Sequence, residues 1–336
     1  MTTSIKALAA FGPKQALQAF EYNPGPLGDE QVEIAVESCG ICHSDLSMLD
    51  NEWGLTAYPF VPGHEVVGKV VAVGEHTKRV KVGDRVGLGW FSRSCGFCHH
   101  CLSGDQNLCL SAEGTIVGRH GGFASHVRAH WLWVSPLPEK LDTSKAGPLL
   151  CGGITVFNPI VQLNVKPTER VGVVGIGGLG HLALKFLRAW GCEVVAFTTS
   201  ESKQQEALTL GAHSTLNSRD SSALAKAASS FDFILNTANA NLDWNAFIAA
   251  LKPRGRLHSV GAVPEPVSLG VFPLLLGQKS FSGSPLGSPA TTDQMLEFAA
   301  RHGIAPTTET FPMSQANEAI EHLRAGKARY RIVLKV

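Results

Sequence analysis

The sequence predicts an α/β protein in which a doubly wound parallel sheet interrupts a second, β-rich domain. Three observations lead to this prediction. A glycine-rich turn follows an apolar strand at 171–174, strand and helix patterns alternate after it, and seven of the eight cysteines precede it. Alternating strands and helices are typical of a parallel sheet. A chain of 336 residues is also long for one core, so we expect two domains.

Composition narrows the class of protein. A hydrophobic content of 44% with 17% charged residues is a globular balance. The formal net charge of +1 argues against nucleic acid as the main partner. No apolar run is long enough to span a bilayer and the first residues lack a signal-peptide pattern, so we expect a cytoplasmic protein without a membrane partner. Eight cysteines in such a protein indicate metal binding or reactivity rather than disulfides.

The glycine-rich turn has the pattern of a dinucleotide site. Gly175, Gly177 and Gly180 form G-x-G-x-x-G between the strand and a helical segment at 181–190. The first glycine permits a tight turn, the second lets backbone approach a pyrophosphate, and the third lets helix pack on strand. The helix N-terminus offers free N–H groups to the anion. The glycines alone would fit any turn, but strand, turn and helix together predict nucleotide binding.

The periodicity after this turn predicts the elements of the sheet and the domain boundaries. Six strands are expected, at 171–174, 193–198, 213–216, 231–235, 256–260 and 279–283. Beyond residue 289 the pattern changes to a helix, a strand, a helix and a strand, at 293–302, 307–311, 313–325 and 328–335. We therefore assign 154–289 to the nucleotide domain, and 1–153 with 290–336 to the domain that it interrupts.

The end of the second strand favours NADP(H) over NAD(H). NAD-specific domains carry an Asp or Glu there, about 20 residues past the glycines, to bind the ribose 2′-OH. This chain has Thr198, Thr199 and Ser200, followed by Lys203. Hydroxyls can donate to a 2′-phosphate and the lysine supplies positive charge, whereas a carboxylate would repel the phosphate. Glu201 is a local objection, but as a first-turn helix residue we expect it to face solvent.

Four cysteines in the segment 92–110 predict a closed metal site. Their spacing is Cys95-x2-Cys98-x2-Cys101-x7-Cys109. Four thiolates so close together match a tetrahedral structural zinc site. An iron–sulfur cluster is the alternative, because thiolates hold those clusters too.

A second metal site is indicated by residues that lie far apart. Cys42 and Cys151 flank His64, which follows a Pro-Gly pair and stands beside Glu65. Two cysteines and one histidine can hold zinc and leave a fourth position open for substrate or water. Spacing alone leaves open whether the three residues meet. A redox role for the Cys39–Cys42 pair is disfavoured, because no βαβ pattern surrounds it.

The motifs together resemble the zinc-dependent medium-chain alcohol dehydrogenases. Gly40-Ile-Cys42-His43-Ser44-Asp45, Pro62-Gly63-His64-Glu65, the four-cysteine loop, Cys151-Gly-Gly-Ile-Thr155 and the glycine turn occur in that family's order. Segments 147–157 and 328–334 are similar to the cinnamyl-alcohol-dehydrogenase-like branch, and within it to bacterial NADPH-dependent aldehyde reductases. The resemblance covers essentially the whole chain. It implies a GroES-like catalytic domain interrupted by a Rossmann domain, with the active site in the cleft between them.

The resemblance also implies roles for individual residues. Cys42, His64 and Cys151 would bind catalytic zinc, with Glu65 able to ligate transiently and Asp45 holding the His64 tautomer. Thr155 would lie near the nicotinamide and Arg331 near the pyrophosphate. We assign the remaining cofactor contacts to Gly178, Leu179, Thr237, Val260, Gly261, Ser282 and Ser284. Two zinc ions per chain and NADP(H) are therefore expected.

The expected reaction is hydride transfer between NADP(H) and a primary alcohol/aldehyde pair, mainly aldehyde reduction. Zinc would polarise the carbonyl, and Ser44 would pass the hydroxyl proton. Many relatives end this relay at a histidine where the chain has Ser47, so the relay can end at the ribose hydroxyl and water or at His43. The sequence leaves this choice, the substrate and the preferred direction open. A zinc-free quinone or enoyl reductase and a non-catalytic zinc-containing nucleotide-binding module are the alternative functions.

Large side chains suggest a substrate pocket and an interface between subunits. Trp53, Trp90 and Phe91 stand near the metal-binding segments and can form an apolar pocket for aromatic or longer aliphatic aldehydes, or can belong to the core. The apolar stretch 272–277 precedes the last predicted strand of the nucleotide sheet at 279–283. An exposed apolar edge favours association, and relatives join two such sheets, so we expect a homodimer.

Overall fold

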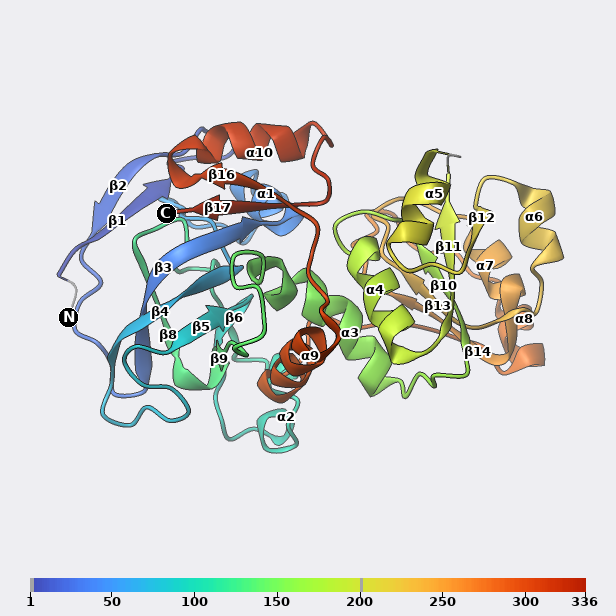
Figure 1. The fold of residues 1–336 in the computed structure, drawn as a ribbon, viewed down its shortest axis with the longest axis horizontal. Helices are drawn as coiled ribbons and strands as arrows, with labels where there is room; N and C mark the ends of the chain where they lie inside the picture. The colour runs from blue at the N-terminus through green and yellow to red at the C-terminus, as the bar shows by residue number, and fades with distance from the viewer. Residues whose placement is uncertain (1–2, 200–201) are drawn as a thin grey trace. The chain divides into compact units, whose positions relative to one another are not determined.

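The computed structural model describes residues 3–199 and 202–336 and divides into two compact units (Figure 1). Unit 1 extends as far as Ile154 and resumes at Leu286–Val336, and unit 2 is Thr155–Pro285. Residues 286–289, which we assigned to the nucleotide domain, belong to unit 1. The physical reason is local, because the Asn107 side-chain amide donates to the Leu286 carbonyl over 2.9 Å.

Unit 2 contains the predicted parallel sheet. Its strands are β10 (Arg170–Val174), β11 (Glu193–Thr198), β12 (Ser214–Asn217), β13 (Phe231–Asn236), β14 (Leu251–Ser259) and β15 (Ser280–Gly283). Their order is β12-β11-β10-β13-β14-β15, with every neighbouring pair parallel. The chain thus builds outward from β10 in one direction and then in the other. This reversal is the switch point of a doubly wound sheet, where ligands bind at the carboxyl ends of the strands.

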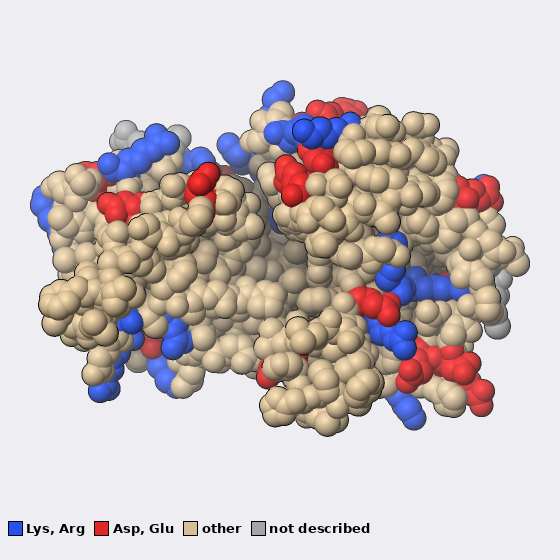
Figure 2. All heavy atoms as spheres, turned by 180° about the vertical axis from the view of Figure 1, so that it is seen from behind, with Lys and Arg blue, Asp and Glu red and all other residues tan. Residues whose placement is uncertain are grey.

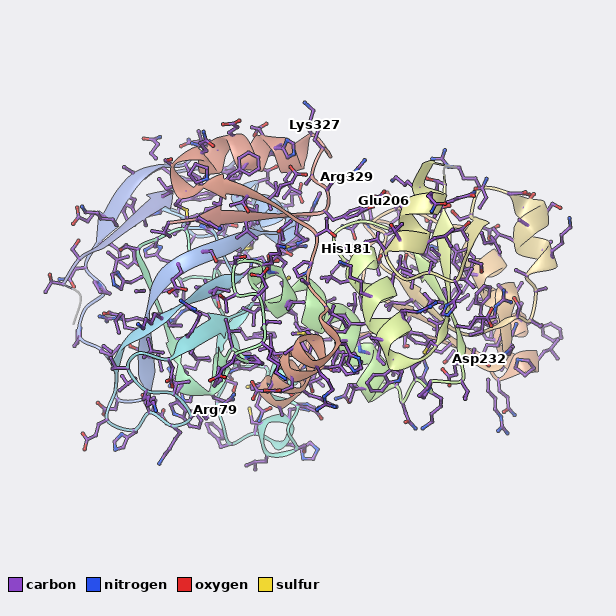
Figure 3. All side chains as sticks on the ribbon, in the orientation of Figure 1. Arg79, His181, Glu206, Asp232, Lys327 and Arg329 are labelled. Atoms are coloured by element: carbon purple, nitrogen blue, oxygen red, sulfur yellow. The ribbon has the colours of Figure 1, made fainter. Side chains whose placement is uncertain are left out.

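Helices and an aromatic core support this sheet. The helices are α3 (Gly152–Gln162), α4 (Gly180–Trp190), α5 (Ser202–Thr209), α6 (Ser221–Lys226), α7 (Trp244–Ala250) and α8 (Val271–Gly277). The ring of Phe197 lies 5.2 Å from those of both Phe231 and Phe247, so β11, β13 and α7 share one core. At the start of β13, Asp232 accepts from the Arg170 backbone and pairs with Lys252 (Figure 3).

Unit 1 is built on a seven-stranded sheet of order β16-β17-β3-β4-β5-β9, with β8 also paired to β3. The strands are β3 (Gln31–Ile41), β4 (Val66–Val73), β5 (Arg85–Leu88), β8 (His126–His130), β9 (Val134–Pro136), β16 (Thr308–Pro312) and β17 (Arg331–Lys335). Two small sheets pair β1 (Ile5–Ala9) with β2 (Gln18–Tyr22) and β6 (Phe91–Arg93) with β7 (Glu113–Gly114). The predicted fold class, a β-rich domain interrupted by a doubly wound one, is confirmed.

The C-terminal strand explains one difference from the predicted elements. The alternation of apolar and polar residues over 31–36 predicts a strand there, but β3 continues to Ile41. The extension exists because β17 pairs antiparallel with it, matching Ile332 to Ile41. The predicted C-terminal strand is in turn shorter, since β17 begins only at Arg331. The end of the chain therefore stiffens the segment that leads to Cys42.

Helices and 3₁₀ turns complete unit 1. They are α1 (His43–Leu49), α2 (His99–Leu102), α9 (Pro289–His302) and α10 (Ala316–Arg324), with 3₁₀ turns η1 (Gln106–Leu108), η2 (Trp131–Trp133), η3 (Gly147–Leu150) and η4 (Met313–Gln315). The predicted helix at 313–325 is thus a 3₁₀ turn followed by α10. Arg79 pairs with Asp293 of α9 over 2.6 Å (Figure 3).

The surface carries mixed charge. On the face drawn in Figure 2, Lys and Arg are interspersed with Asp and Glu. Within residues 3–199 and 202–336, no helix combines the length and apolar character needed to cross a membrane.

Candidate metal centre and nucleotide site

Four buried side chains of unit 1 converge on one point. Ligand atoms of Cys42, His64, Glu65 and Cys151 all lie within 4.8 Å of one another. Cys42 caps the N-terminus of α1 directly after β3, and Cys151 follows η3. His64 and Glu65 precede β4, whose pairing with β3 matches Val66 to Cys39. Strand pairing therefore assembles residues that are far apart in the sequence.

Asp45 orients two members of this cluster. Its Oδ1 accepts from His64 Nδ1 at 3.0 Å and from the Gly63 backbone at 2.8 Å, and its Oδ2 accepts from the Cys42 backbone at 2.9 Å. A carboxylate bound to Nδ1 places the imidazole proton there and leaves Nε2 free to bind a metal. Nε2 faces the sulfur of Cys151 at 3.3 Å. Asp45 thus holds His64 in the tautomer that a ligand needs.

The separations within the cluster fit zinc. Tetrahedral coordination with Zn–S bonds of about 2.3 Å places two sulfurs roughly 3.8 Å apart. The sulfurs of Cys42 and Cys151 are 3.8 Å apart, far beyond a disulfide bond, and both thiols are free. The hydrogen bond from Cys151 and the positive charge of Arg331 hold the pKa of Cys42 well below its ordinary value. The cluster therefore offers two cysteines and a histidine, with the Glu65 carboxylate as a fourth possible ligand.

Glu65 and Arg331 form a buried ion pair behind these ligands. Burial raises the pKa of Glu65, and the adjacent guanidinium opposes that rise. Glu65 Oε2 has no hydrogen-bond partner in the described chain and is free to approach an ion. The carboxylate occupies the space that a Cβ at Gly40 would need, so position 40 requires glycine.

Arg331 has a contact that the sequence did not predict. Its guanidinium pairs with Glu65 and lies 4.0 Å from the Cys42 sulfur. The reason is electrostatic, because a carboxylate removed from water needs a counter-charge. The expected contact of Arg331 with the cofactor pyrophosphate stays a prediction.

The predicted proton-relay residues lie on α1. Ser44 Oγ is 3.7 Å from the Cys42 sulfur, next to the cluster. Ser47, which replaces the histidine of many relatives, donates its hydroxyl to Glu52 at 2.7 Å. His43 is exposed.

Two of the three predicted pocket aromatics lie near the cluster. The ring of Trp90 stands 5.0 Å from the His64 ring, edge to face, and the Trp53 ring is 6.0 Å from Trp90. Phe91 instead packs at 5.1 Å on Trp133 of the unit 1 core. Trp90 precedes β6 and Phe91 begins it, and both residues also line one cavity together with Trp133.

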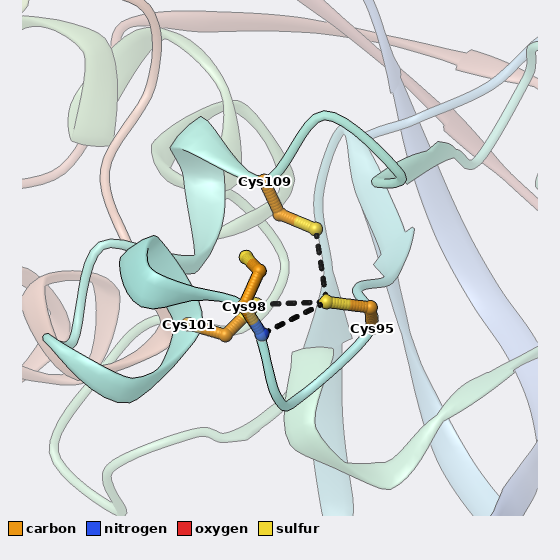
Figure 4. A group of neighbouring side chains, drawn as sticks. All are labelled: Cys95, Cys98, Cys101 and Cys109. Atoms are coloured by element: carbon orange, nitrogen blue, oxygen red, sulfur yellow. Dashed lines mark hydrogen bonds between the residues drawn. The ribbon is translucent and has the colours of Figure 1, made fainter.

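The four remaining cysteines of the predicted metal sites form a second cluster (Figure 4). The Cys95 sulfur is 3.8 Å from that of Cys101 and 3.6 Å from that of Cys109, again the separation expected around zinc. The Cys98 backbone N–H donates to the Cys95 sulfur at 3.3 Å. Backbone N–H groups of Phe97 and Cys98 lower the pKa of Cys95 to about 6, which favours the thiolate that a metal binds.

The glycine turn of unit 2 has the geometry predicted for a nucleotide loop. Gly175 adopts φ +85°, which favours glycine, and a Cβ at Gly180 would collide with the Gly175 carbonyl. The Thr237 hydroxyl bonds the carbonyls of Val174 and Gly175 at 3.0 and 2.5 Å, so it supports the turn. Gly177, Gly178 and Leu179 precede α4, and His181 on its first turn bonds the Gly177 carbonyl (Figure 3).

The residues predicted to select NADP(H) end β11. Thr198 is buried and its hydroxyl has no hydrogen-bond partner in the described chain. Thr199 is exposed, and Lys203 is half-buried on the first turn of α5. Ser200 and Glu201 lie outside the described residues.

The other predicted cofactor residues of unit 2 lie near the ends of further elements. Val260 and Gly261 follow β14, Ser282 and Ser284 lie at the end of β15, and Thr155 is half-buried on α3. The glycine turn, Thr198 and Thr237 lie at the same edge of the sheet. The predicted cofactor residues are therefore found at the carboxyl ends of β10, β11, β13, β14 and β15.

Two buried residues at this edge escaped the sequence analysis. Asn236 bonds Ala238 and Ser259, and His258 bonds Ser282 and Ser284. Each is a polar residue in an otherwise apolar strand, and this contrast is the feature of the sequence that could have indicated a buried hydrogen-bonding role.

Fold and clusters together define a class of protein, a zinc-containing oxidoreductase with a dinucleotide-binding sheet. Comparison with known proteins agrees. Residues 28–139 match the alcohol dehydrogenase GroES-like domain and residues 178–301 match the zinc-binding dehydrogenase model. The chain is 59% identical over 330 residues to aldehyde reductase AdhA of Synechocystis sp., covering 98% of each.

Two solved structures are similar over their whole length. The cinnamyl alcohol dehydrogenase of Sorghum bicolor has a TM-score of 0.94 at 38% identity, covering 99% of this chain and 97% of that one. CAD from Helicobacter pylori, complexed with NADP(H), has a TM-score of 0.90 at 30% identity, covering 100% and 99%. The chain belongs to the zinc-binding medium-chain alcohol dehydrogenases, in their cinnamyl-alcohol-dehydrogenase-like branch.

This membership confirms the predicted family and enzyme class. The protein is an oxidoreductase that acts on alcohol/aldehyde pairs. Membership also disfavours the iron–sulfur alternative and a zinc-free reductase, because the family is zinc-binding and the chain brings Cys42, His64 and Cys151 together.

Proposed function

We propose that this enzyme reduces aldehydes to primary alcohols with NADPH at a zinc ion held by Cys42, His64 and Cys151. The convergence of these three ligands, with the Glu65 carboxylate beside them, carries the proposal. The name aldehyde reductase borne by the Synechocystis relative supports the direction of reaction. When bound, zinc polarises the carbonyl oxygen and NADPH supplies the hydride.

The chain's own groups prepare this chemistry. Asp45 holds the Nδ1 side of His64, so Nε2 is the nitrogen directed at the metal position, and the positive charge of Arg331 stabilises the buried carboxylate of Glu65. Ser44, next to Cys42, is our candidate for passing a proton to the alkoxide oxygen. Since Ser47 is bonded to Glu52, we place no base at that position. Ser44 then regains its proton from solvent, either through the ribose hydroxyl and water or through the exposed His43.

NADPH is proposed from the charge at the end of β11. A 2′-phosphate needs donors and positive charge, and a carboxylate would repel it. Thr198 and Thr199 supply hydroxyls there, and Lys203 supplies an ammonium group within the next helical turn. The NADP(H) in the Helicobacter relative is consistent with this choice.

Substrate preference is proposed from the aromatic wall beside the metal cluster. Trp90 contacts His64, and Trp53 contacts Trp90 while exposing 42% of its surface. Flat apolar faces favour aromatic or longer aliphatic aldehydes, because these bury more apolar area than short ones.

A homodimer is proposed from the exposed edge of unit 2. β15 ends the sheet within the described residues, and the neighbouring α8 exposes Val271, Phe272, Leu275 and Leu276 by 65–75%. A second copy of this chain can cover both the strand edge and the apolar helix. Light scattering at micromolar concentration tests this, and a monomer would contradict it.

We also propose a cytoplasmic location, since all eight cysteines are free thiols.

Steady-state kinetics on the purified enzyme test the proposed function. We expect two zinc ions per chain by metal analysis and a higher kcat/KM with NADPH than with NADH. Across a panel of aldehydes, kcat/KM should rise with chain length and aromaticity. No turnover of any aldehyde despite bound cofactor would point instead to a non-catalytic nucleotide-binding module.

A further inference from the structure

His258 joins the last two strands of the nucleotide sheet through both ring nitrogens. Its Nδ1 bonds Ser282 Oγ at 2.8 Å and its Nε2 bonds Ser284 Oγ at 2.9 Å. The ring is 1% exposed and stacks on Phe233, with centroids 6.2 Å apart. In the register of β14 and β15, His258 stands directly beside Ser282. One buried side chain therefore fixes both serines at the end of β15.

The ring is neutral, and this determines what the serines can do. Burial, with a smaller contribution from the positive charge of Arg256, lowers its pKa to about 4. A neutral imidazole donates one hydrogen bond and accepts one. One serine therefore donates its hydroxyl to the ring, while the other accepts from the ring and keeps its own O–H free. The end of β15 thus presents one hydroxyl that is fixed in place and available to donate.

The strand order places this hydroxyl on the nicotinamide side of the site. The pyrophosphate is expected at the turn after β10, and the 2′-phosphate at the end of β11. The other half of the dinucleotide must then extend away from β11, over β13 and toward β14 and β15. Strands lie about 4.8 Å apart, so β15 is roughly 14 Å from β10. The nicotinamide riboside half therefore extends in the direction of β15.

We propose that His258 is a positioning residue for the nicotinamide half of the cofactor. Through Ser282 and Ser284 it fixes the segment 282–284, whose free hydroxyl and backbone groups meet the carboxamide. A carboxamide both donates and accepts, so it needs partners held in a defined direction. The proposal rests on the proposed use of NADPH. It adds a residue, His258, that acts through Ser282 and Ser284 and not by direct contact with the cofactor.

The test compares two ligands on the zinc-containing enzyme. NADPH occupies the whole site, whereas 2′-phospho-ADP-ribose lacks the nicotinamide and uses the β10 and β11 side alone. His258→Phe keeps the ring and its stack on Phe233 but removes both hydrogen bonds. We expect this variant to raise the Kd and KM for NADPH roughly tenfold, the effect of losing one to two ordinary hydrogen bonds. Its Kd for 2′-phospho-ADP-ribose should stay within twofold of wild type.

Two conservative variants test the two hydrogen bonds of His258 one at a time. The amide of His258→Asn can reproduce the Nδ1 contact to Ser282, and that of His258→Gln the Nε2 contact to Ser284. We expect at least one of them to recover NADPH affinity, with kcat changing less than KM. If His258→Phe does not fold, Ser282→Ala and Ser284→Ala provide the same comparison. At least one of them should lower the affinity for NADPH and leave the affinity for 2′-phospho-ADP-ribose unchanged.

Three results would overturn the proposal. The first is an unchanged Kd for NADPH in His258→Phe. The second is an equal loss of affinity for NADPH and for 2′-phospho-ADP-ribose. The third is a failure of both His258→Asn and His258→Gln to recover NADPH affinity. These outcomes are distinct from a failure of the proposed function. If wild type preferred NADH or reduced no aldehyde, the proposed function would be wrong. Comparing the Kd values of NADH and ADP-ribose in wild type and His258→Phe would then still test the positioning role of His258.

Discussion

Replacing Asp45 with asparagine should empty the catalytic zinc site while leaving the four-cysteine site filled. The Asp45 carboxylate accepts three hydrogen bonds, two at Oδ1 from His64 and Gly63 and one at Oδ2 from the Cys42 backbone. Asparagine has the same shape but only one acceptor oxygen. If that oxygen keeps the Oδ1 bonds, its NH₂ group faces the Cys42 N–H, and two donors meet in a buried place.

The size of the effect follows from these contacts. An unsatisfied buried donor costs about 1–3 kcal/mol, and loss of an outer partner of a metal-binding histidine reduces metal affinity about 10–100-fold. We therefore expect zinc affinity at the Cys42 site to fall by that factor. Activity should fall with it, because a neutral amide oxygen holds the Nδ1–H of His64 less strongly than a carboxylate does.

The assay is dialysis against a graded series of chelator concentrations, followed by metal analysis and activity measurement. Asp45→Asn should go from two zinc ions per chain to one at a chelator concentration that leaves wild type fully loaded. Asp50→Asn is a matched control, since Asp50 caps the same helix but pairs with Arg324. Zinc retention in Asp45→Asn within twofold of wild type would refute the role that we give to Asp45.

Three further predictions concern the other parts of the site. Cys98→Ala should remove the second zinc and lower Tm with the catalytic ligands intact, because structural zinc contributes folding energy; an unchanged Tm would show that these cysteines hold no structural metal. Ser44→Ala should lower kcat roughly 10²-fold, the lower end for lost acid–base help, while Ser44→Thr keeps a hydroxyl and most of the activity; equal kcat in the two variants would exclude Ser44 from the relay. Thr198→Asp should raise KM for NADPH sharply and leave NADH kinetics similar or improved, because the carboxylate repels a 2′-phosphate; untouched NADPH kinetics would contradict the proposed cofactor site.

Features encoded by neighbouring residues were accessible from the sequence alone. The strand, glycine turn and helix at 170–190 predict a parallel nucleotide sheet, because each has a local pattern of apolar residues and glycines. The cysteines at 95–109 predict a metal cluster for the same reason, since a short loop cannot hold them far apart. The family resemblance rested on such motifs in their order.

Contacts between distant segments were decided by the tertiary structure. The sequence left open whether Cys42, His64 and Cys151 meet, and the pairing of β3 with β4 brings Cys42 and His64 together. It gave no sign that Arg331 pairs with Glu65, a contact that the pairing of β17 with β3 creates. A buried charge takes the nearest counter-charge that the fold provides, and no local pattern specifies which one that is.

His258 shows the same limit at the nucleotide edge. In the sequence it is one histidine in an apolar strand, with no spacing that links it to Ser282 or Ser284. Parallel pairing of β14 with β15 sets it beside both hydroxyls, and burial there keeps its ring neutral. Periodicity predicts which strands exist and which faces they bury. The partners of a polar group in those strands depend on the register between them, which only the packed sheet determines.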